Sequence, residues 1–355
     1  MEKSYQSDKS GNQTIPDNSE RKSDHINLAL QSQTSVNEAD NRFYYEPMIS
    51  GFPVNHSEQI PFAGKKLNVP IWVSSMTGGH RLSGIINRNL AMACKEFGMG
   101  MGLGSCRMLL NDDTYFNDFN VRSIIGDDHP LFANLGIAQI EQMVEKNETD
   151  ELRRLIDRLR ADGLIIHVNP LQEWIQPEGN TIRHPPVETI ENLLEKIDFQ
   201  LIVKEVGQGF GPQSIRRLLQ LPLAAMEFGA LGGTNFSKIE IHRNSIFKKE
   251  LYQPFVNIGA TAEEMVELIN EMLLSGENFA CKHLIISGGI RNYLDGFYLT
   301  EKSILTAIYA QASVFLKYSQ GDYSELQQFV AAQIEGYRMA KNYLTLKVPK
   351  GIKKV

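Results

Sequence analysis

Short apolar segments that end in glycine or small polar residues alternate along this chain with longer amphipathic segments, and this alternation constrains the fold most strongly. A run such as GLIIHVN (163–169) is apolar and has the length of a strand, whereas the apolar residues of TAEEMVELINEML (261–273) recur at helical spacing. Apolar strands that alternate with helices form a parallel sheet covered by helices. The candidates are therefore an open doubly wound sheet and a closed (β/α)8 barrel.

Nine segments have the composition of a strand, and they lie at 69–76, 99–105, 130–136, 163–169, 200–207, 222–229, 254–259, 283–289 and 307–315. The segment 254–259 directly precedes the helical pattern at 261–273, and a loop that leads into a helix explains it better. Eight strands then remain, which is the number in a TIM barrel. We therefore predict an α/β fold, a (β/α)8 TIM barrel, with polar and glycine-rich residues gathered at the mouth that the C-terminal strand ends form.

Composition and cysteine usage limit the class of protein. The 42 acidic residues exceed the 36 basic residues, and the net charge of −6 argues against a protein that coats nucleic acid or a membrane. Cys94, Cys106 and Cys281 form neither a C-x-x-C pair nor a zinc-binding pattern. The sequence shows no apolar signal-peptide core. We expect a cytoplasmic protein with a disordered polar tail at 1–20, one barrel domain at 21–345 and a basic tail at 346–355.

A glycine pair follows the seventh predicted strand, in the sequence SGGIR at 287–291. In TIM barrels the loops after the last two strands commonly hold a phosphate on backbone amides and on the N-terminus of a short helix. Gly288 and Gly289 permit a close approach of the backbone to such an anion. The alternative is that they only turn a tight corner. A second glycine pair at 232–233 favours the phosphate of a cofactor.

Lys204 lies near the end of an otherwise apolar strand, so we expect its ammonium to point into the barrel mouth. A buried ammonium is costly without an anionic partner. One explanation is a structural ion pair with Glu205 or Glu227. The other is the electron-rich edge of a flavin ring, which becomes anionic on reduction.

The fourth predicted strand ends in HVNPLQE, which concentrates polar side chains at the mouth. Strand alternation places His167 and Asn169 on one face, and the following proline turns the chain so that Gln172 and Glu173 lie on the loop. His and Asn donate to an anion, Gln both donates and accepts, and a Glu oxygen suits Mg²⁺. A capping or core role would explain one such residue. It explains four of them within seven positions poorly.

Two further basic sites are candidates for anion binding. Arg21, Lys22 and His25 form a compact cluster where the polar N-terminal segment gives way to INLAL. Charges near a terminus are usually solvated, so a plain surface is the alternative for this cluster. Arg107 lies just beyond GLGS at a strand end and is better placed.

In their order and spacing, the motifs RKSDHI, SSMTGGH, GSCR, NLG, HVNPLQE, VKEVG, GGTNF and SGGIRN resemble those of the type 2 isopentenyl-diphosphate isomerases, which are FMN-dependent TIM-barrel enzymes. The resemblance extends from about Arg21 to Leu316. SGGIR and GGT also occur in other FMN barrels. RKxxH followed much later by H-x-N-x-x-Q-E is specific for this family.

The resemblance implies an enzyme that interconverts isopentenyl and dimethylallyl diphosphate, with reduced FMN and Mg²⁺ as cofactors and NADPH as the reductant. The substrate would contact Arg21, Lys22, His25, Arg107, His167, Asn169 and, beside the reacting carbons, Gln172. Glu173 would bind Mg²⁺. FMN would contact Met76, Thr77, Gly78, Ser105, Asn134, Lys204, Thr234, Gly288, Gly289, Arg291 and Ala312. A homo-oligomer, either a tetramer or an octamer, is implied as well.

Three positions depart from the family pattern. Cys106 stands where the family usually has a glutamine. The run EFGALGGT replaces D-x-S-G-x-G-G-T, so Gly229 stands for a serine and Ala230 for a glycine. These departures concern one hydrogen bond to FMN and one to the substrate.

Moving a proton across an unactivated alkene requires an acid at one carbon and a base at its neighbour, and these side chains alone do this poorly in water. We hypothesise that reduced FMN is the main acid and base and that Gln172 relays or orients the second proton. One alternative is an FMN-dependent 2-hydroxy-acid oxidase or dehydrogenase, which needs a histidine base and an arginine pair. The other is a non-catalytic flavin-binding barrel, which has no need of Gln172 and Glu173.

Overall fold

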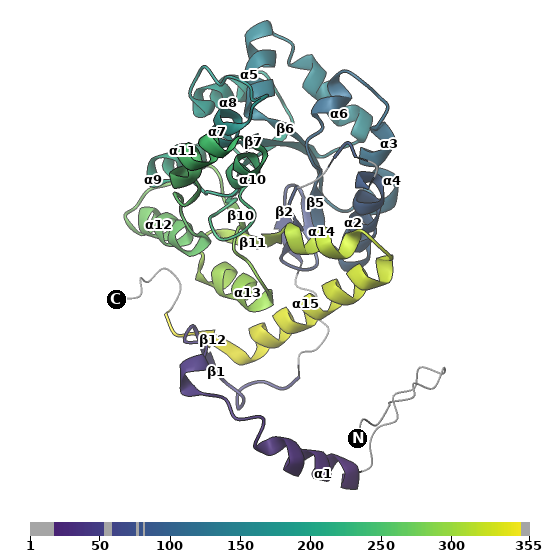
Figure 1. Cartoon of the computed structure of the whole chain (residues 1–355), viewed down its shortest axis with the longest axis vertical. Helices are drawn as coiled ribbons and strands as arrows, with labels where there is room; N and C mark the ends of the chain where they lie inside the picture. Colours follow the sequence, from purple (N-terminus) through teal and green to yellow (C-terminus); the bar gives the residue numbers. More distant parts are fainter. Residues whose placement is uncertain (1–17, 53–58, 76–77, 81, 349–355) are drawn as a thin grey trace. The chain divides into compact units, whose positions relative to one another are not determined.

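The computed structural model describes residues 18–52, 59–75, 78–80 and 82–348 (Figure 1). The chain divides into two compact units, Met1–Asn41 and Arg42–Val355. In the first unit the described elements are helix α1 (Asn18–Ala29) and the 3-10 helix η1 (Val36–Glu38). Most of the predicted tail at 1–20 lies outside the described residues, so its extent stays a prediction.

The second unit contains a closed barrel of eight parallel strands, which confirms the predicted TIM barrel. The barrel strands are β4 (Ile71–Val73), β5 (Gly100–Gly102), β6 (Leu131–Gly136), β7 (Gly163–Val168), β8 (Gln200–Glu205), β9 (Ala225–Glu227), β10 (His283–Ser287) and β11 (Thr306–Gln311). They follow chain order around the barrel, and β11 closes against β4. The ninth candidate segment, 254–259, is not a strand, because its first residues end a helix.

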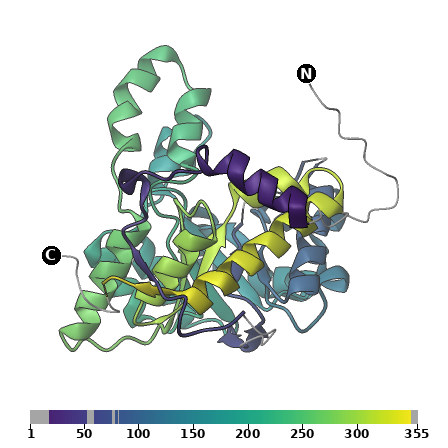
Figure 2. The same ribbon diagram turned by 90° about the horizontal axis from the view of Figure 1, so that it is seen from below.

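Helices cover the outside of the barrel, as Figure 1 shows. They are α2 (Ser83–Phe97), η2 (Arg107–Leu110), α3 (Phe116–Phe119), α4 (Arg122–Ile125), α5 (Ile137–Lys146), α6 (Asp150–Leu159), α7 (Pro170–Ile175), α8 (Pro186–Leu194), α9 (Pro212–Gln220), α10 (Phe236–Arg243), α11 (Ile246–Val256), α12 (Ala262–Leu274), α13 (Tyr293–Lys302), α14 (Ser313–Ser319) and α15 (Tyr323–Tyr343). The long helix α15, yellow in Figures 1 and 2, packs against α2, α13 and α14. No helix among the described residues is long and apolar enough to cross a membrane.

Helix α6 shows why these segments become helical and where they pack. Leu152, Leu155, Ile156 and Leu159 are buried, and their spacing of three and four residues places them on one face of the helix. Arg160 then adopts a left-handed conformation, with φ of 49°, and ends the helix. Most other helices of this unit supply apolar faces to one continuous core around the barrel, whereas Ile175 of α7, Ile241 of α10 and Val256 of α11 form a separate small core.

A second core fills the barrel itself, and it follows the two-residue period of the strands. Along β7, Ile165 belongs to the inner core, whereas Leu164 and Ile166 belong to the outer one. Large inner residues from other strands include Trp72, Phe132, Ile202, Ile285 and Ile308. Two positions after an inner core residue, six strands have a polar side chain, and these are Ser74, Asn134, His167, Lys204, Glu227 and Ser287, whereas β11 has Ala310. Alternation therefore places these polar side chains on the inner side at the mouth.

A short hairpin closes the opposite end of the barrel. It consists of β2 (Ile60–Phe62) and β3 (Lys65–Leu67), and its turn contains Ala63 and Gly64, both with positive φ. Phe62 and Leu67 are buried in the inner core, so the hairpin covers the start of the strands. This hairpin was not predicted from the sequence.

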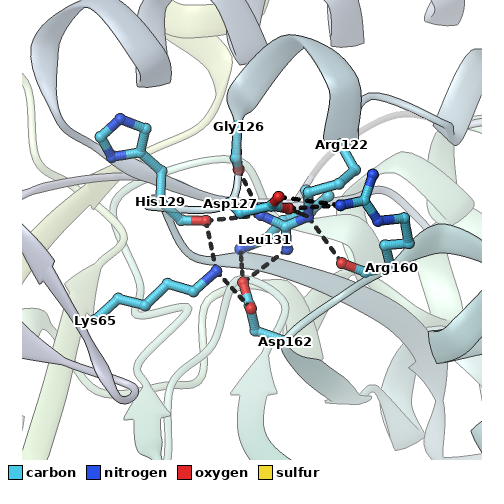
Figure 3. Close-up of polar contacts among 8 residues, drawn as sticks. All are labelled: Lys65, Arg122, Gly126, Asp127, His129, Leu131, Arg160 and Asp162. Atoms are coloured by element: carbon cyan, nitrogen blue, oxygen red, sulfur yellow. Dashed lines mark hydrogen bonds and ion pairs between the residues drawn. The ribbon is translucent and has the colours of Figure 1, made fainter.

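An ion-pair network fastens this hairpin to the barrel (Figure 3). Lys65 Nζ lies 2.5 Å from a carboxylate oxygen of Asp162 and donates to the carbonyl oxygen of His129. Arg122 is buried and pairs with the other oxygen of Asp162 at 2.8 Å. The same oxygen accepts the amide of Leu131, at the start of β6. One carboxylate thus joins the hairpin to α4 and to two barrel strands.

Two terminal strands of this unit pair with one another outside the barrel. Strand β1 (Phe43–Tyr45) is antiparallel to β12 (Leu344–Leu346). The predicted basic tail begins in β12, and residues 349–355 lie outside the described residues. Cys94, Cys106 and Cys281 are free and buried.

Candidate active site

The mouth of the barrel contains a cavity of about 290 Å³ at the ends of β4 and β8 to β11. Six predicted cofactor residues line it, and they are Lys204, Thr234, Gly288, Gly289, Arg291 and Ala312. Further polar side chains that were not predicted as cofactor contacts line it too, and they include Ser74, Ser75, Ser287 and Gln311. Within the described part of the chain, Ser75 Oγ and Gln311 Oε1 are buried without a hydrogen-bond partner. Such atoms suit a polar ligand.

Two glycine loops form one wall of this cavity and pack backbone against backbone. Gly288 and Gly289 have φ of 92° and 74°, a region that favours glycine. A Cβ atom at Gly288 would lie 2.1 Å from the carbonyl oxygen of Ala230, and one at Gly233 would lie 3.1 Å from the amide nitrogen of Gly289. Loops that lack side chains can present backbone amides to an anion. The wall therefore suits a phosphate group.

The geometry explains why Gly229 replaces the serine of the family pattern. Its φ is 52°, and a Cβ atom there would lie 2.0 Å from the carbonyl oxygen of Glu205. Its amide donates to Ser287 Oγ at 2.8 Å. In this loop conformation a side chain at position 229 is excluded.

Lys204 and Glu227 lie on neighbouring strands at the floor of the mouth. Lys204 Nζ donates to the carbonyl oxygen of Glu205 at 2.9 Å. Glu227 is fully buried and accepts from Ser74 Oγ, while its Oε2 has no partner within the described residues. Burial raises the pKa of Glu227, and the Lys204 charge and its hydroxyl partners oppose this rise. The Glu205 carboxylate instead accepts the amides of the loop after β8, including Gly207 at 2.7 Å.

His167 extends into the mouth from β7 and contacts Asn134 on β6. His167 Nδ1 lies 2.8 Å from Asn134 Oδ1. Asn134 Nδ2 donates to the carbonyl oxygen of Leu103 at 3.1 Å. Removal from water, aided by the positive charge of Lys204, lowers the pKa of His167 well below its ordinary value. His167 is therefore a neutral side chain here.

The HVNPLQE segment forms a hydrogen-bonded chain of side chains at the start of α7. Asn169 is buried, and its Nδ2 donates to Gln172 Oε1 at 3.1 Å and to Glu173 Oε1 at 3.2 Å. Gln172 Nε2 donates in turn to Glu240 Oε1 at 3.4 Å. Glu173 Oε2 accepts the backbone amide of Asn180 at 2.6 Å. The structure thus brings the predicted residues Asn169, Gln172 and Glu173 together.

Other predicted residues line another pocket, lie in the first unit or fall outside the described residues. Gly78, Ser105 and Arg107 line a shallow pocket near η2. Met76 and Thr77 lie outside the described residues. The predicted substrate residues Arg21, Lys22 and His25 lie on α1, in the first unit, so their role at the mouth stays a prediction.

Several residues of the site were not predicted from the sequence, for two different reasons. Ser74 and Ser287 occupy inner positions two residues after Trp72 and Ile285, so a strict use of strand alternation would have found them. The contacts of Asn180 and Glu240 depend on loop and helix packing far along the chain, and no local pattern signals them. Among the described residues no group of three or more His, Cys, Asp or Glu side chains could hold a metal ion.

No family model matches the chain, whereas individual proteins do. An isopentenyl-diphosphate delta-isomerase of Rickettsia felis is 33% identical over 324 residues, which cover 89% of this chain and 90% of that protein. Isomerases with the same name from a Nostoc species and from Chlorobium chlorochromatii are 34% and 31% identical. The Nostoc match covers 78% of this chain and 77% of that protein, and the Chlorobium match covers 78% and 80%.

Solved structures of similar architecture include a mandelate oxidase and flavocytochrome b2. The mandelate oxidase, solved with an FMN adduct, has a TM-score of 0.52 and is 14% identical, with 86% of this chain and 88% of that chain covered. A flavocytochrome b2 has a TM-score of 0.59 and is 12% identical, with 85% and 72% covered. Identities this low show a shared TIM-barrel fold and nothing further.

Proposed function

Since this chain belongs to the isopentenyl-diphosphate delta-isomerases, we propose that it interconverts isopentenyl and dimethylallyl diphosphate by a 1,3-proton shift. One observation carries this proposal beyond the family name. The HVNPLQE cluster and the glycine-lined cavity meet at adjacent strands, where His167 on β7 is the register partner of Lys204 on β8. A polar cluster suited to a diphosphate and a cavity suited to a phosphate-bearing cofactor thus share one mouth.

FMN is the cofactor that the cavity fits best. The loops at Gly233 and Gly288 would hold its phosphate, together with Arg291, whose guanidinium is mostly exposed. Lys204 would lie against the flavin ring, and its cation would favour the anionic reduced form. When bound and reduced, FMN supplies the acid and base groups that the side chains lack. NADPH is the reductant in this proposal.

The diphosphate of the substrate would bind beside the flavin site through His167, Asn169 and Arg107. Glu173 would bind Mg²⁺, since a single carboxylate together with substrate phosphates is a common Mg²⁺ arrangement. Glu173 is partly exposed, and Asn169 and Asn180 hold both of its oxygens in place. Binding energy from the diphosphate then positions the alkene for proton transfer.

Gln172 would orient or relay the second proton. Its amide is held at both ends, because Oε1 accepts from Asn169 and Nε2 donates to Glu240. Glu240 is itself buried and pairs with Arg243 at 2.6 Å, which keeps the carboxylate in place. Gln172 therefore has a fixed orientation beside the predicted reacting carbons.

A 2-hydroxy-acid oxidase or dehydrogenase is the second candidate, because the solved structures of similar fold include a mandelate oxidase and flavocytochrome b2. That reaction needs a histidine base and an arginine pair for a carboxylate. The mouth supports it poorly, since the carboxylate of Glu173 would repel such a substrate. The identity to isomerases over most of both chains also favours the first proposal.

A turnover assay separates the candidates. Isopentenyl diphosphate is given to the purified protein with Mg²⁺ and with FMN that NADPH has reduced under anaerobic conditions. A panel of 2-hydroxy acids is given to the same protein with oxidised FMN in air, where O₂ accepts the electrons. We expect dimethylallyl diphosphate and no oxidation of the hydroxy acids. Oxidation of a hydroxy acid without isomerisation would favour the second candidate, and binding of FMN without any turnover would favour a non-catalytic flavin barrel.

We further propose that the protein is a cytoplasmic homo-oligomer.

A further inference from the structure

We infer that Asn134 is a positioning residue that holds His167 as its neutral Nδ1–H tautomer, and that His167 takes up one proton from solution when the substrate diphosphate binds. The inference rests on the proposed function for the identity of the anion. Its first half, the tautomer of the free protein, is independent of any ligand.

The orientation of the Asn134 amide is fixed by a partner that can only accept. The carbonyl oxygen of Leu103 lies 3.1 Å from one end of the amide, so that end must be Nδ2. The other end, which lies 2.8 Å from His167 Nδ1, must then be Oδ1. Reversing the amide would bring two oxygens together at Leu103. Asn134 is buried, so water cannot replace the lost hydrogen bond.

The fixed amide in turn determines where the imidazole carries its proton. Asn134 Oδ1 accepts, so Nδ1 of His167 must donate. In the neutral ring Nε2 then holds a lone pair. The backbone leaves room for this edge of the ring because position 136 is glycine, where a Cβ atom would lie 2.9 Å from Nε2. A lone pair directed at a deprotonated phosphate oxygen repels it, so Nε2 of the neutral ring cannot donate a hydrogen bond to the diphosphate.

The charge around the ring keeps it neutral until an anion arrives. The positive charge that acts on the ring is Lys204, the register partner of His167 on β8. Strand β6 faces the ring with Asn134, and the first turn of α5 faces it with Gln139, both of which are neutral. A diphosphate at the mouth would offset the charge of Lys204 and favour the protonated ring. Protonated Nε2 could then donate to a phosphate oxygen while Nδ1 still donates to Asn134.

Nitrogen-15 NMR of the free protein tests the tautomer. With labelled histidine, and with His167→Gln to assign the signal, we expect a neutral ring protonated at Nδ1 at pH 7.5. The variant Asn134→Asp, which places a carboxylate at Nδ1, should raise the pKa of the ring, whereas Asn134→Ala should release the preference for Nδ1–H. An Nε2–H tautomer in the wild type would overturn the inference, whatever the activity of the enzyme.

Calorimetric titration with inorganic pyrophosphate and Mg²⁺ tests the proton uptake. The binding heats in two buffers with different ionisation enthalpies give the number of protons taken up on binding. The number measured for His167→Gln is the contribution of the pyrophosphate itself, and it is subtracted from the number measured for the wild type. We expect the wild type to take up about one proton more than the variant, and its affinity to fall by up to ~10-fold per pH unit above neutrality, the limit for one linked proton.

The failures of the two proposals are distinguishable. Turnover of isopentenyl diphosphate with equal proton uptake in wild type and His167→Gln would overturn this inference and leave the proposed function intact. Absence of both turnover and pyrophosphate binding would overturn the proposed function and, with it, the proton uptake. The NMR result on the free protein would still decide the role of Asn134.

Discussion

Backbone geometry at a single residue accounts for one departure from the family sequence. Gly229 adopts a φ of 52°, and a Cβ atom there would lie 2.0 Å from the carbonyl oxygen of Glu205. We expect Gly229→Ser to destabilise the protein by about 1–3 kcal/mol, the range for a strained backbone, and to weaken FMN binding. Gly51→Ser is the matched control, because no atom lies within 4 Å of a Cβ there. Urea unfolding with equal midpoints for both variants would show that the loop tolerates a side chain.

The neutral state of His167 also has a consequence for stability. Its folded-state pKa lies below the ordinary 6.5, so the unfolded chain binds a proton more readily than the native protein does. Stability should therefore fall as the pH drops from 6.5 toward the folded-state pKa, by at most ~1.4 kcal/mol per pH unit from this group. The variant His167→Gln should lack this loss of stability, because its side chain at position 167 does not titrate. Urea unfolding at pH 7 and pH 5 measures it, and an unchanged pH dependence in the variant would contradict it.

At the scale of elements, the hairpin at the closed end of the barrel depends on one shared carboxylate. Asp162 binds both Lys65 of β3 and the buried Arg122, whose side chain is 2% exposed. Asp162→Asn leaves Arg122 buried without this partner, so we expect a loss of about 3–5 kcal/mol in the free energy of unfolding. Asp127→Asn is the control, because the Asp127 side chain is 73% exposed and lies 4.0 Å from Arg122, against 2.8 Å for Asp162, and surface pairs contribute about 0–1 kcal/mol. Equal effects in urea unfolding would contradict this account.

Helix α7 carries the predicted Mg²⁺ ligand Glu173, so binding of the metal and binding of the flavin can be tested separately. Glu173→Gln should abolish turnover or raise the Mg²⁺ concentration required for it, while the flavin spectrum stays unchanged. Glu178→Gln, in the loop after α7, is the control, because the Glu178 side chain is 54% exposed and pairs with Arg243. Full activity of Glu173→Gln in excess chelator would exclude a metal role for this carboxylate.

At the scale of the whole molecule, the barrel could be predicted because eight apolar strands alternate with amphipathic helices along the chain. The hairpin of β2 and β3 could not, since segments as short as IPF and KKL gain their stability from tertiary packing against Trp72. The residues of the site fall into the same two groups, those that a sequence pattern predicts and those that only the folded chain brings together. Strand alternation predicts which side His167 and Lys204 occupy, whereas Asn180 meets Glu173 only after the loop has folded.

All three cysteine thiols are buried, so we predict that they react only when the protein unfolds. Burial raises the pKa of Cys106 to about 12 and that of Cys281 to about 11, and it raises the pKa of Cys94 further. Iodoacetamide should therefore leave the native protein unmodified at pH 8 and alkylate the cysteines as the protein unfolds in urea. Mass spectrometry across the unfolding transition checks this, and rapid alkylation of Cys106 in the native state would contradict its buried position.

We propose that this barrel isomerises its substrate without net redox chemistry. The most direct measurement is the number of turnovers per flavin in deuterated water, with FMN reduced once under anaerobic conditions, Mg²⁺ and isopentenyl diphosphate. We predict many turnovers per flavin and solvent deuterium in the allylic product, with a loss of ~10²-fold or more in Gln172→Ala, as for general acid and base groups. One flavin oxidised for each product formed, or normal turnover in Gln172→Ala with FMN retained, would contradict the account.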